Sequence, residues 1–191
     1  MQKIDRVKFF DCYKASFGSL SQSQVDNINF LLDKFDESEI IMRLSEYAYI
    51  LATIKHECAE TYAPITEMGS QHYLQSKSYY PFIGRGYVQL TWRNNYQRFK
   101  EILGIDLINN PDLAKDPETA WKILEIGMSK GLFTGVKLSN YFTDTKTDFK
   151  NARRIINGTD RAELIAGYAE KFFNGLELIE EDEASEAKPE E

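Results

Sequence analysis

Two glutamates ten residues apart, Glu57 and Glu67, are the side chains of this sequence best suited to do chemistry. Glu57 follows a long apolar segment with helical spacing, whereas Glu67 follows Pro64 in a polar stretch that does not favour helix. Hydrolysis of a glycosidic bond needs a protonated carboxyl that donates to the leaving oxygen and a carboxylate that attacks or activates water. Burial favours the protonated form of Glu57 and polar surroundings favour the ionised form of Glu67, which indicates acid and base roles respectively.

The segment GRGYVQLTWRNNY, residues 84–96, strengthens this interpretation because it joins a glycine turn to amides and hydroxyls. These side chains, which include Gln89, Thr91 and Asn95, are of the kind that hold water and sugars. Two carboxylates alone are weak evidence in a chain with 30 acidic residues. Glu60 lies one helical turn beyond Glu57 and competes for either role.

The two histidines do not form a metal motif. His56 precedes Glu57 in HECAE, which lacks the second histidine of the H-E-x-x-H zinc motif, and His72 stands at no matching spacing. We therefore predict neither a metal nor a cofactor. The two cysteines, Cys12 and Cys58, have no ligand spacing either, and we predict free thiols.

The spacing of apolar residues predicts a mainly α-helical domain with at most a small β-hairpin. The predicted helices cover 22–35 behind a Ser21 cap, Glu37 or Ser38 to Glu57, 94–103 ended by Gly104, Pro117 to Gly131 behind an Asp116 cap, 148–157, and 160–174 capped by Asp160. A surface loop is predicted at 69–86, followed by a short extended piece at 87–90.

Charge separates a folded body from a tail. Residues 177–191 hold eight acids and one lysine, which account for the whole net charge of −7, and this composition predicts a disordered acidic tail behind a domain at 1–176. The near-neutral body has no basic stripe, so we predict no nucleic-acid partner. No apolar run is long enough for stable membrane insertion and the N-terminal residues do not form a secretory signal, so we expect cytoplasmic synthesis.

These motifs resemble glycoside hydrolase family 19, the chitinase class I family, and in particular its compact bacteriophage and prophage endolysin branch. The resemblance covers about residues 4–175. It rests on the His-Glu pair at 56–57, a second glutamate about ten residues later, and the ordered matches GRGYVQLTWRNNY, LINNPDLAKDPETAW and RRIINGTD. The short connection between the two glutamates fits the endolysin branch, because plant chitinases carry a longer insertion there.

The resemblance implies a lysozyme-like helical fold with two lobes around a central cleft, and an inverting mechanism. Carried over by position, it gives the following roles: Glu57 as general acid, Glu67 as general base, Thr91 as a holder of the attacking water, and Gln89, Asn95, Tyr96 and Asn157 as sugar-binding residues. Thr159 stands where the family often has a further glycine, so the surroundings of Asn157 depart from the pattern.

The expected function is hydrolysis of β-1,4 bonds between the amino sugars of bacterial peptidoglycan. The alternatives are a chitinase that acts on N-acetylglucosamine polymers, and a non-catalytic saccharide-binding phage component. The resemblance implies a monomer that acts at the cell wall after release, with help from a holin-type membrane protein.

Overall fold

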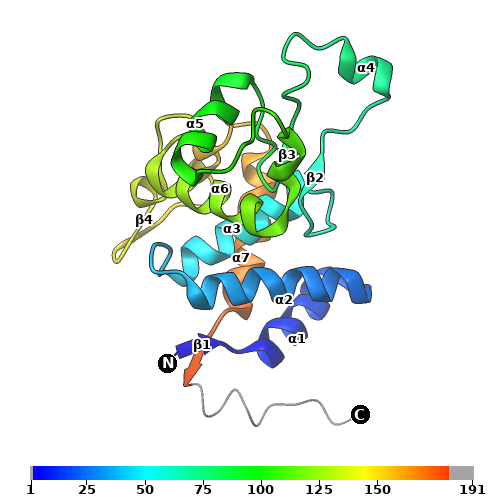
Figure 1. Ribbon diagram of the computed structural model, residues 1–191. Helices are drawn as coiled ribbons and strands as arrows, with labels where there is room; N and C mark the ends of the chain where they lie inside the picture. Colours follow the sequence, from blue (N-terminus) through cyan, green and yellow to red (C-terminus); the bar gives the residue numbers. More distant parts are fainter. Residues whose placement is uncertain (1, 181–191) are drawn as a thin grey trace.

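The computed structural model describes residues 2–180, and this part of the chain is mainly helical (Figure 1). The α-helices are α1 (Arg6–Phe17), α2 (Gln22–Glu37), α3 (Leu44–Glu57), α4 (Gln71–Gln75), α5 (Arg93–Leu103), α6 (Pro117–Lys130) and α7 (Ala162–Gly175). The 3₁₀ helices are η1 (Pro111–Lys115), η2 (Leu138–Asn140) and η3 (Asn151–Ile155). The strands are β1 (Gln2–Ile4), β2 (Ile65–Thr66), β3 (Arg85–Gly86), β4 (Phe142–Thr143), β5 (Lys146–Thr147) and β6 (Leu178–Glu180).

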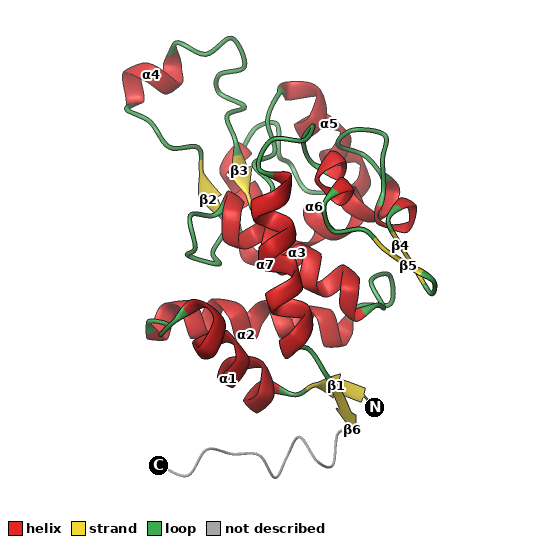
Figure 2. Cartoon of the chain, turned by 180° about the vertical axis from the view of Figure 1, so that it is seen from behind, coloured by secondary structure: helices red, strands yellow, loops and turns green. Residues whose placement is uncertain are grey.

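Helix α3 forms the centre of the fold. Its residues from Ser45 to Lys55 are all buried, and it packs most extensively against α7. Figures 1 and 2 place α1 and α2 on one side of this helix pair and α5 and α6 on the other. A helix surrounded in this way must be apolar on most of its faces, as the sequence predicted. None of the helices within residues 2–180 has the length and apolar character needed to cross a membrane.

Most predicted helix ends are confirmed. Ser21 caps α2 through a capping box with Gln24, and the Asp116 carboxylate accepts the hydrogen bond that caps α6. Helices α5 and α6 end at Gly104 and Gly131, both in the left-handed conformation that glycine adopts most easily. Local chemistry therefore determines where these three helices begin or end.

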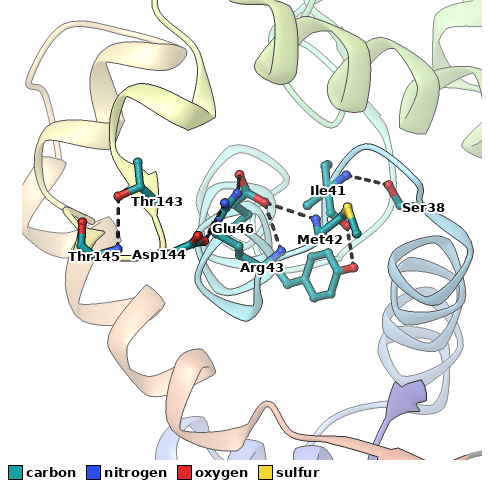
Figure 3. A network of polar contacts seen from close by, with 9 residues as sticks. Ser38, Ile41, Met42, Arg43, Glu46, Thr143, Asp144 and Thr145 are labelled. Atoms are coloured by element: carbon teal, nitrogen blue, oxygen red, sulfur yellow. Dashed lines mark hydrogen bonds and ion pairs between the residues drawn. The ribbon is translucent and has the colours of Figure 1, made fainter. Parts of the chain in front are cut away.

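The start of α3 differs from the prediction. Helix α2 continues to Glu37, and α3 begins only at Leu44. The Glu46 carboxylate accepts hydrogen bonds from the backbone N–H groups of Met42 and Arg43 at 3.2 and 3.1 Å, which fixes the first turn there (Figure 3). The signal for this start is an acid in the first turn, which satisfies backbone donors that would otherwise lack a partner.

Several smaller elements also differ. Residues 87–89 form a turn instead of an extended piece, because Leu90 folds back to form a bridge with Arg85 and Gln89 has a φ of 54°. The segment 148–157 contains the 3₁₀ helix η3, and the N-cap of α7 is Arg161 in place of Asp160. Three two-stranded ribbons are present in the described part of the chain, where at most one hairpin was expected.

The first residues of the predicted tail belong to the folded body. Strand β6 pairs antiparallel with β1, and the Asp5 N–H donates to the Glu177 carbonyl at 2.9 Å. These contacts bring the two ends of the described chain together (Figure 2). The remainder of the predicted tail, 181–191, lies outside the described residues.

The second glycine of the Gly-Arg-Gly turn is required by two independent features of the fold. Gly86 has a φ of 84°, and a Cβ placed on it would lie 2.9 Å from the Ala114 carbonyl oxygen of η1. The close approach of this backbone to η1 therefore leaves no room for a side chain. Gly135 provides a comparison, because its φ is 86° and nothing lies within 4 Å of its Cβ position.

We predict that Gly86→Ala lowers the free energy of unfolding by about 3 kcal/mol, from backbone strain and the carbonyl clash together. Gly135→Ala carries the strain without the clash and should cost about 1 kcal/mol. Denaturant unfolding of both variants beside the parent measures the difference. Equal costs would show that the approach of β3 to η1 does not constrain the fold.

Candidate active site

The Glu57 carboxylate lies at the C-terminal end of α3 and is held by a buried arginine. Arg153 Nη1 donates to Glu57 Oε1 at 2.6 Å, and the two side chains are 3% and 17% exposed. Arg153 Nε also donates to the Asp160 carbonyl at 2.9 Å, which fixes the guanidinium from a second side. Glu57 Oε2 accepts no hydrogen bond within residues 2–180, so this oxygen has no protein donor.

Arg153 changes the interpretation of Glu57. The sequence predicted mainly apolar surroundings for this carboxyl, and the presence of a cation at 2.6 Å corrects that prediction. The motif RRIINGTD contained the arginine, but only Asn157 in it was given a role. Because Arg153 is 96 positions from Glu57, no local pattern connects the two residues.

Glu67 is held at both carboxylate oxygens. Its backbone N–H donates to the Gly84 carbonyl at 2.7 Å, and Gly84 N–H donates back to Oε2 at 3.0 Å. The Tyr79 hydroxyl donates to Oε1 at 2.8 Å. Glu67 is thus oriented by a backbone group and a phenol, both neutral donors, and Tyr79 is a contact that the sequence did not reveal.

A single ribbon brings the two glutamates into one region. Cys58, next to Glu57 in the chain, directs its thiol at the carbonyls of Gly86 and Tyr87, at 3.9 and 3.6 Å. Gly86 pairs with Ile65 in the β2–β3 ribbon, and Glu67 extends the same strand. Burial raises the pKa of the Cys58 thiol to about 12, so it remains a neutral donor to these carbonyls. Cys12 and Cys58 are both free thiols, as predicted.

Three of the predicted water-holding and sugar-binding residues, Gln89, Thr91 and Asn95, line one cavity of about 130 Å³. It is lined by Val88, Gln89, Leu90, Thr91, Asn95, Phe133 and Ile156. The Thr91 hydroxyl donates to the Gln89 carbonyl at 2.8 Å, and Asn95 Nδ2 donates to the Thr91 carbonyl at 2.8 Å. The Thr91 oxygen can still accept a hydrogen bond from water.

Gln89 also braces the ribbon. Its amide nitrogen lies 3.2 Å from the carbonyls of both Ile65 and Gly86, across the two paired strands. Its Oε1 is packed so closely on Gly84 that a Cβ there would lie 2.7 Å away. The first glycine of the turn is therefore needed to admit this side chain, and only part of the Gln89 amide remains for a sugar.

The prediction that Tyr96 binds sugar is wrong. Its side chain is fully buried, its hydroxyl donates to the Ile83 carbonyl at 2.7 Å, and Arg85 Nη1 donates to the hydroxyl at 3.0 Å. Burial raises the pKa of Tyr96. Tyr96 therefore anchors the segment before the Gly-Arg-Gly turn to α5.

Asn157 lies at the surface beside the cavity. Its N–H donates to the Arg153 carbonyl at 2.9 Å, and its Oδ1 accepts from Gly158 N–H at 2.9 Å. Ile156, the preceding residue, lines the cavity. This placement leaves the Asn157 amide nitrogen available at the edge of the site.

Glu60 faces away from Glu57. Lys55, 4% exposed, pairs with Glu60 at 3.2 Å and lies over the rings of Phe17 and Tyr168 at 4.7 and 5.3 Å. Residues two positions apart on a helix point roughly 200° apart, so Lys55 and Glu57 occupy opposite faces of α3. Glu60 is therefore engaged on the side of α1 and α7 and does not compete for the role of either glutamate.

The histidines lie apart from each other. His56 is half-buried on α3, and His72 is exposed on α4. Among the described residues, no group of three or more His, Cys, Asp or Glu is placed to hold a metal ion.

Comparison with protein families gives one match, on the segment that carries both glutamates. Residues 46–125 match the model of glycoside hydrolase family 19, described as chitinase class I. The chain is 51% identical over 43 residues to Chitinase 11 of Oryza sativa, and 37% identical over 68 residues to Endochitinase A2 of Pisum sativum. It is also 54% identical over 37 residues to a Hevea brasiliensis protein named inactive chitinase-like protein 1.

These sequence matches are partial. The aligned segments are 22, 32 and 19% of this chain, and they span 17, 21 and 11% of the rice, pea and Hevea proteins. The chain thus covers about a fifth or less of the length of these curated relatives.

Solved structures match over most of the chain. Chitinase C from Streptomyces griseus HUT6037 gives a TM-score of 0.51 at 21% identity, covering 87% of this chain and 72% of that one. A bacterial family 19 chitinase gives 0.52 at 20% identity, covering 88 and 92%. At this identity the likeness establishes the fold, and the predicted lysozyme-like helical fold is confirmed.

The Glu57–Arg153 contact predicts a stability effect. Arg153→Met removes the partner of a mostly buried carboxylate and should lower the free energy of unfolding by about 3–5 kcal/mol. The double variant with Glu57→Gln should recover part of that loss, because no unpaired charge remains. Lys150→Met removes the exposed pair with Glu163 and should change stability by less than about 1 kcal/mol. Equal costs for Arg153→Met and Lys150→Met would contradict the burial argument.

Proposed function

We propose that this protein hydrolyses β-1,4 bonds between amino sugars, with bacterial peptidoglycan as its substrate, because residues 46–125 match the model of glycoside hydrolase family 19, described as chitinase class I. The proposal rests on two carboxylates with different partners, Glu57 at the end of α3 and Glu67 beside the β2–β3 ribbon. Glu57 has a cation on one oxygen and the other oxygen free, whereas Glu67 is oriented at both oxygens by neutral donors.

Glu57 acts as the general acid. Arg153 fixes Oε1, which leaves Oε2 to carry the proton toward the glycosidic oxygen. As the bond from C1 to that oxygen breaks, its electron pair takes this proton and the leaving sugar departs with a hydroxyl group. The positive charge of Arg153 then stabilises the carboxylate that remains on Glu57.

Glu67 acts as the general base. It accepts a proton from a water that attacks C1 on the face opposite the leaving group, while the Thr91 oxygen accepts the second hydrogen bond of that water. Such single displacement inverts the configuration at C1 and requires carboxyl groups roughly 6.5–9.5 Å apart. A base held by two donors keeps a fixed direction toward the water, which is the geometry that this reaction needs.

Separate observations support peptidoglycan and chitin as the polymer that is cleaved. The short connection between Glu57 and Glu67 supports peptidoglycan, because it fits the endolysin branch of the family. The names of the plant relatives, which are chitinases, support chitin as the second candidate. Both polymers present N-acetylated sugars in β-1,4 linkage, so the same machinery serves either.

We also propose a lytic role for the protein. It reaches the cell wall from the cytoplasm after a holin-type membrane protein opens a path, and it acts there as a monomer. The resemblance to phage and prophage endolysins supports this part of the proposal.

We predict that the purified protein releases reducing ends from peptidoglycan, and that Glu57→Gln and Glu67→Gln each lower the rate about 10²–10⁴-fold by removing general acid or base catalysis. Glu60→Gln is the matched control, because Glu60 faces Lys55, and should retain activity. Cell-wall binding without release of reducing ends would overturn the proposal and favour a non-catalytic saccharide-binding protein, the state that the name of the Hevea relative suggests.

Two further measurements test which polymer is the substrate and whether the reaction inverts the configuration at C1. Faster turnover of chitin oligomers than of peptidoglycan would replace the proposed substrate by the second candidate. Proton NMR of the first products should show the α-anomer, as single displacement requires. An initial β-anomer would exclude the inverting mechanism.

A further inference from the structure

The chain between Glu67 and Gly84 forms an arm that projects from the body of the molecule. It consists of residues 68–83 and carries the short helix α4 (Figures 1 and 2). A backbone hydrogen bond from Glu67 to Gly84 joins the two ends of the arm. Arm residues next to this backbone pair are therefore adjacent to Glu67, the proposed catalytic base.

Tyr79 is the arm residue that reaches Glu67. Its hydroxyl donates to Glu67 Oε1 at 2.8 Å, and its ring meets the edge of Trp92 with centroids 5.1 Å apart at 64°. Trp92 is 52% exposed and has a φ of 74°, a conformation that a bulky residue rarely adopts. Its N–H donates to the Phe82 carbonyl at 2.9 Å, which ties it to the end of the arm.

The two donors to Glu67 differ in what holds them. Gly84 N–H belongs to the strand extension and fixes Oε2 through the backbone. The contact at Oε1 depends on Tyr79 alone, which is placed by the arm and by the ring of Trp92. Rotation of the carboxylate is therefore restricted only while the arm keeps Tyr79 in place.

The charges around this contact are few. The charge of Glu67 acts on Tyr79, on Lys77 and on the buried Tyr96, and Tyr79 also interacts electrostatically with Lys77 and Tyr73. Lys77 lies over the Tyr73 ring at 3.8 Å. The hydrogen bond to Glu67, followed by burial, raises the pKa of Tyr79, so its phenol remains a proton donor across the working range of a carboxylate base.

We propose that Tyr79 is a positioning residue for Glu67, which it holds correctly turned toward the attacking water. This inference rests on the proposed function for its kinetic consequences, although the contact itself does not. The inference assigns the arm the function of orienting Glu67, because the Tyr79 hydroxyl is one of only two donors to the Glu67 carboxylate in the described part of the chain.

The kinetic test compares Tyr79→Phe with Tyr80→Phe on the substrate that the parent protein cleaves. Tyr80 is the neighbouring exposed tyrosine of the arm, and its hydroxyl takes no part in the contacts of Glu67. Tyr79→Phe should lower kcat about 3- to 10-fold, the effect of losing one hydrogen bond, with KM within about twofold. Tyr80→Phe should change neither quantity.

A titration that needs no activity tests the contact itself. Tyrosine labelled with ¹³C at Cζ reports the ionisation of each phenol by NMR, and Tyr79→Phe identifies the Tyr79 signal. In Glu67→Gln the Tyr79 phenol should ionise at lower pH than in the parent, because the carboxylate that opposes its ionisation is gone.

Two results would overturn the inference. One is an unchanged Tyr79 titration in Glu67→Gln, and the other is a Tyr79→Phe variant that loses affinity for substrate while kcat stays the same. A parent protein without activity would refute the proposed function, and the NMR titration would still decide whether Tyr79 holds Glu67.

Discussion

Burying α3 from Ser45 to Lys55 forces the charges near its C-terminal end to find partners. Lys55 and Glu57 lie on opposite faces of the helix, and isolated charges there would cost several kcal/mol each. Lys55 pairs with Glu60 among aromatic rings, and Glu57 pairs with Arg153 of η3. The first pair fixes the turn that leads toward Glu67, and the second binds α3 to a segment almost a hundred residues away. The requirement to neutralise a buried helix end thus also positions the proposed acid.

The turn between the two glutamates is strained, and the packing around it explains how the strain persists. Ala59, Glu60 and Tyr62 all have positive φ, at 48, 63 and 56°, a conformation that costs of order 1–3 kcal/mol at each non-glycine residue. The Tyr62 hydroxyl lies 2.9 Å from that of Tyr13, and Gln24 Nε2 donates to the Glu60 carbonyl at 2.9 Å. Helices α1 and α2, remote from the chemistry, therefore hold the connection that sets Glu67 relative to Glu57.

The sequence predicted what local chemistry controls. Caps such as Ser21 and Asp116 and the glycine stops of α5 and α6 were confirmed, because each depends on residues within one turn. It failed where a distant partner decides. Tyr96 was assigned to sugar binding from its place in a motif, yet its hydroxyl is taken up by Ile83 and Arg85 in the core. Arg153 and Tyr79 were missed for the same reason, since a motif gives residue types and does not show which side chains meet.

The structure also changes the physical basis for distinguishing the two glutamates. The sequence argument separated them by burial, with an apolar environment for Glu57 and a polar one for Glu67. In the fold both carboxylates are partly buried and both accept hydrogen bonds, so burial alone does not separate them. What differs is the pattern of donors. Glu57 has a cation on one oxygen and a free second oxygen, the arrangement of a group that must release a proton and then carry a negative charge. Glu67 has a neutral donor on each oxygen, the arrangement of a group that must stay ionised in a fixed direction until water delivers a proton.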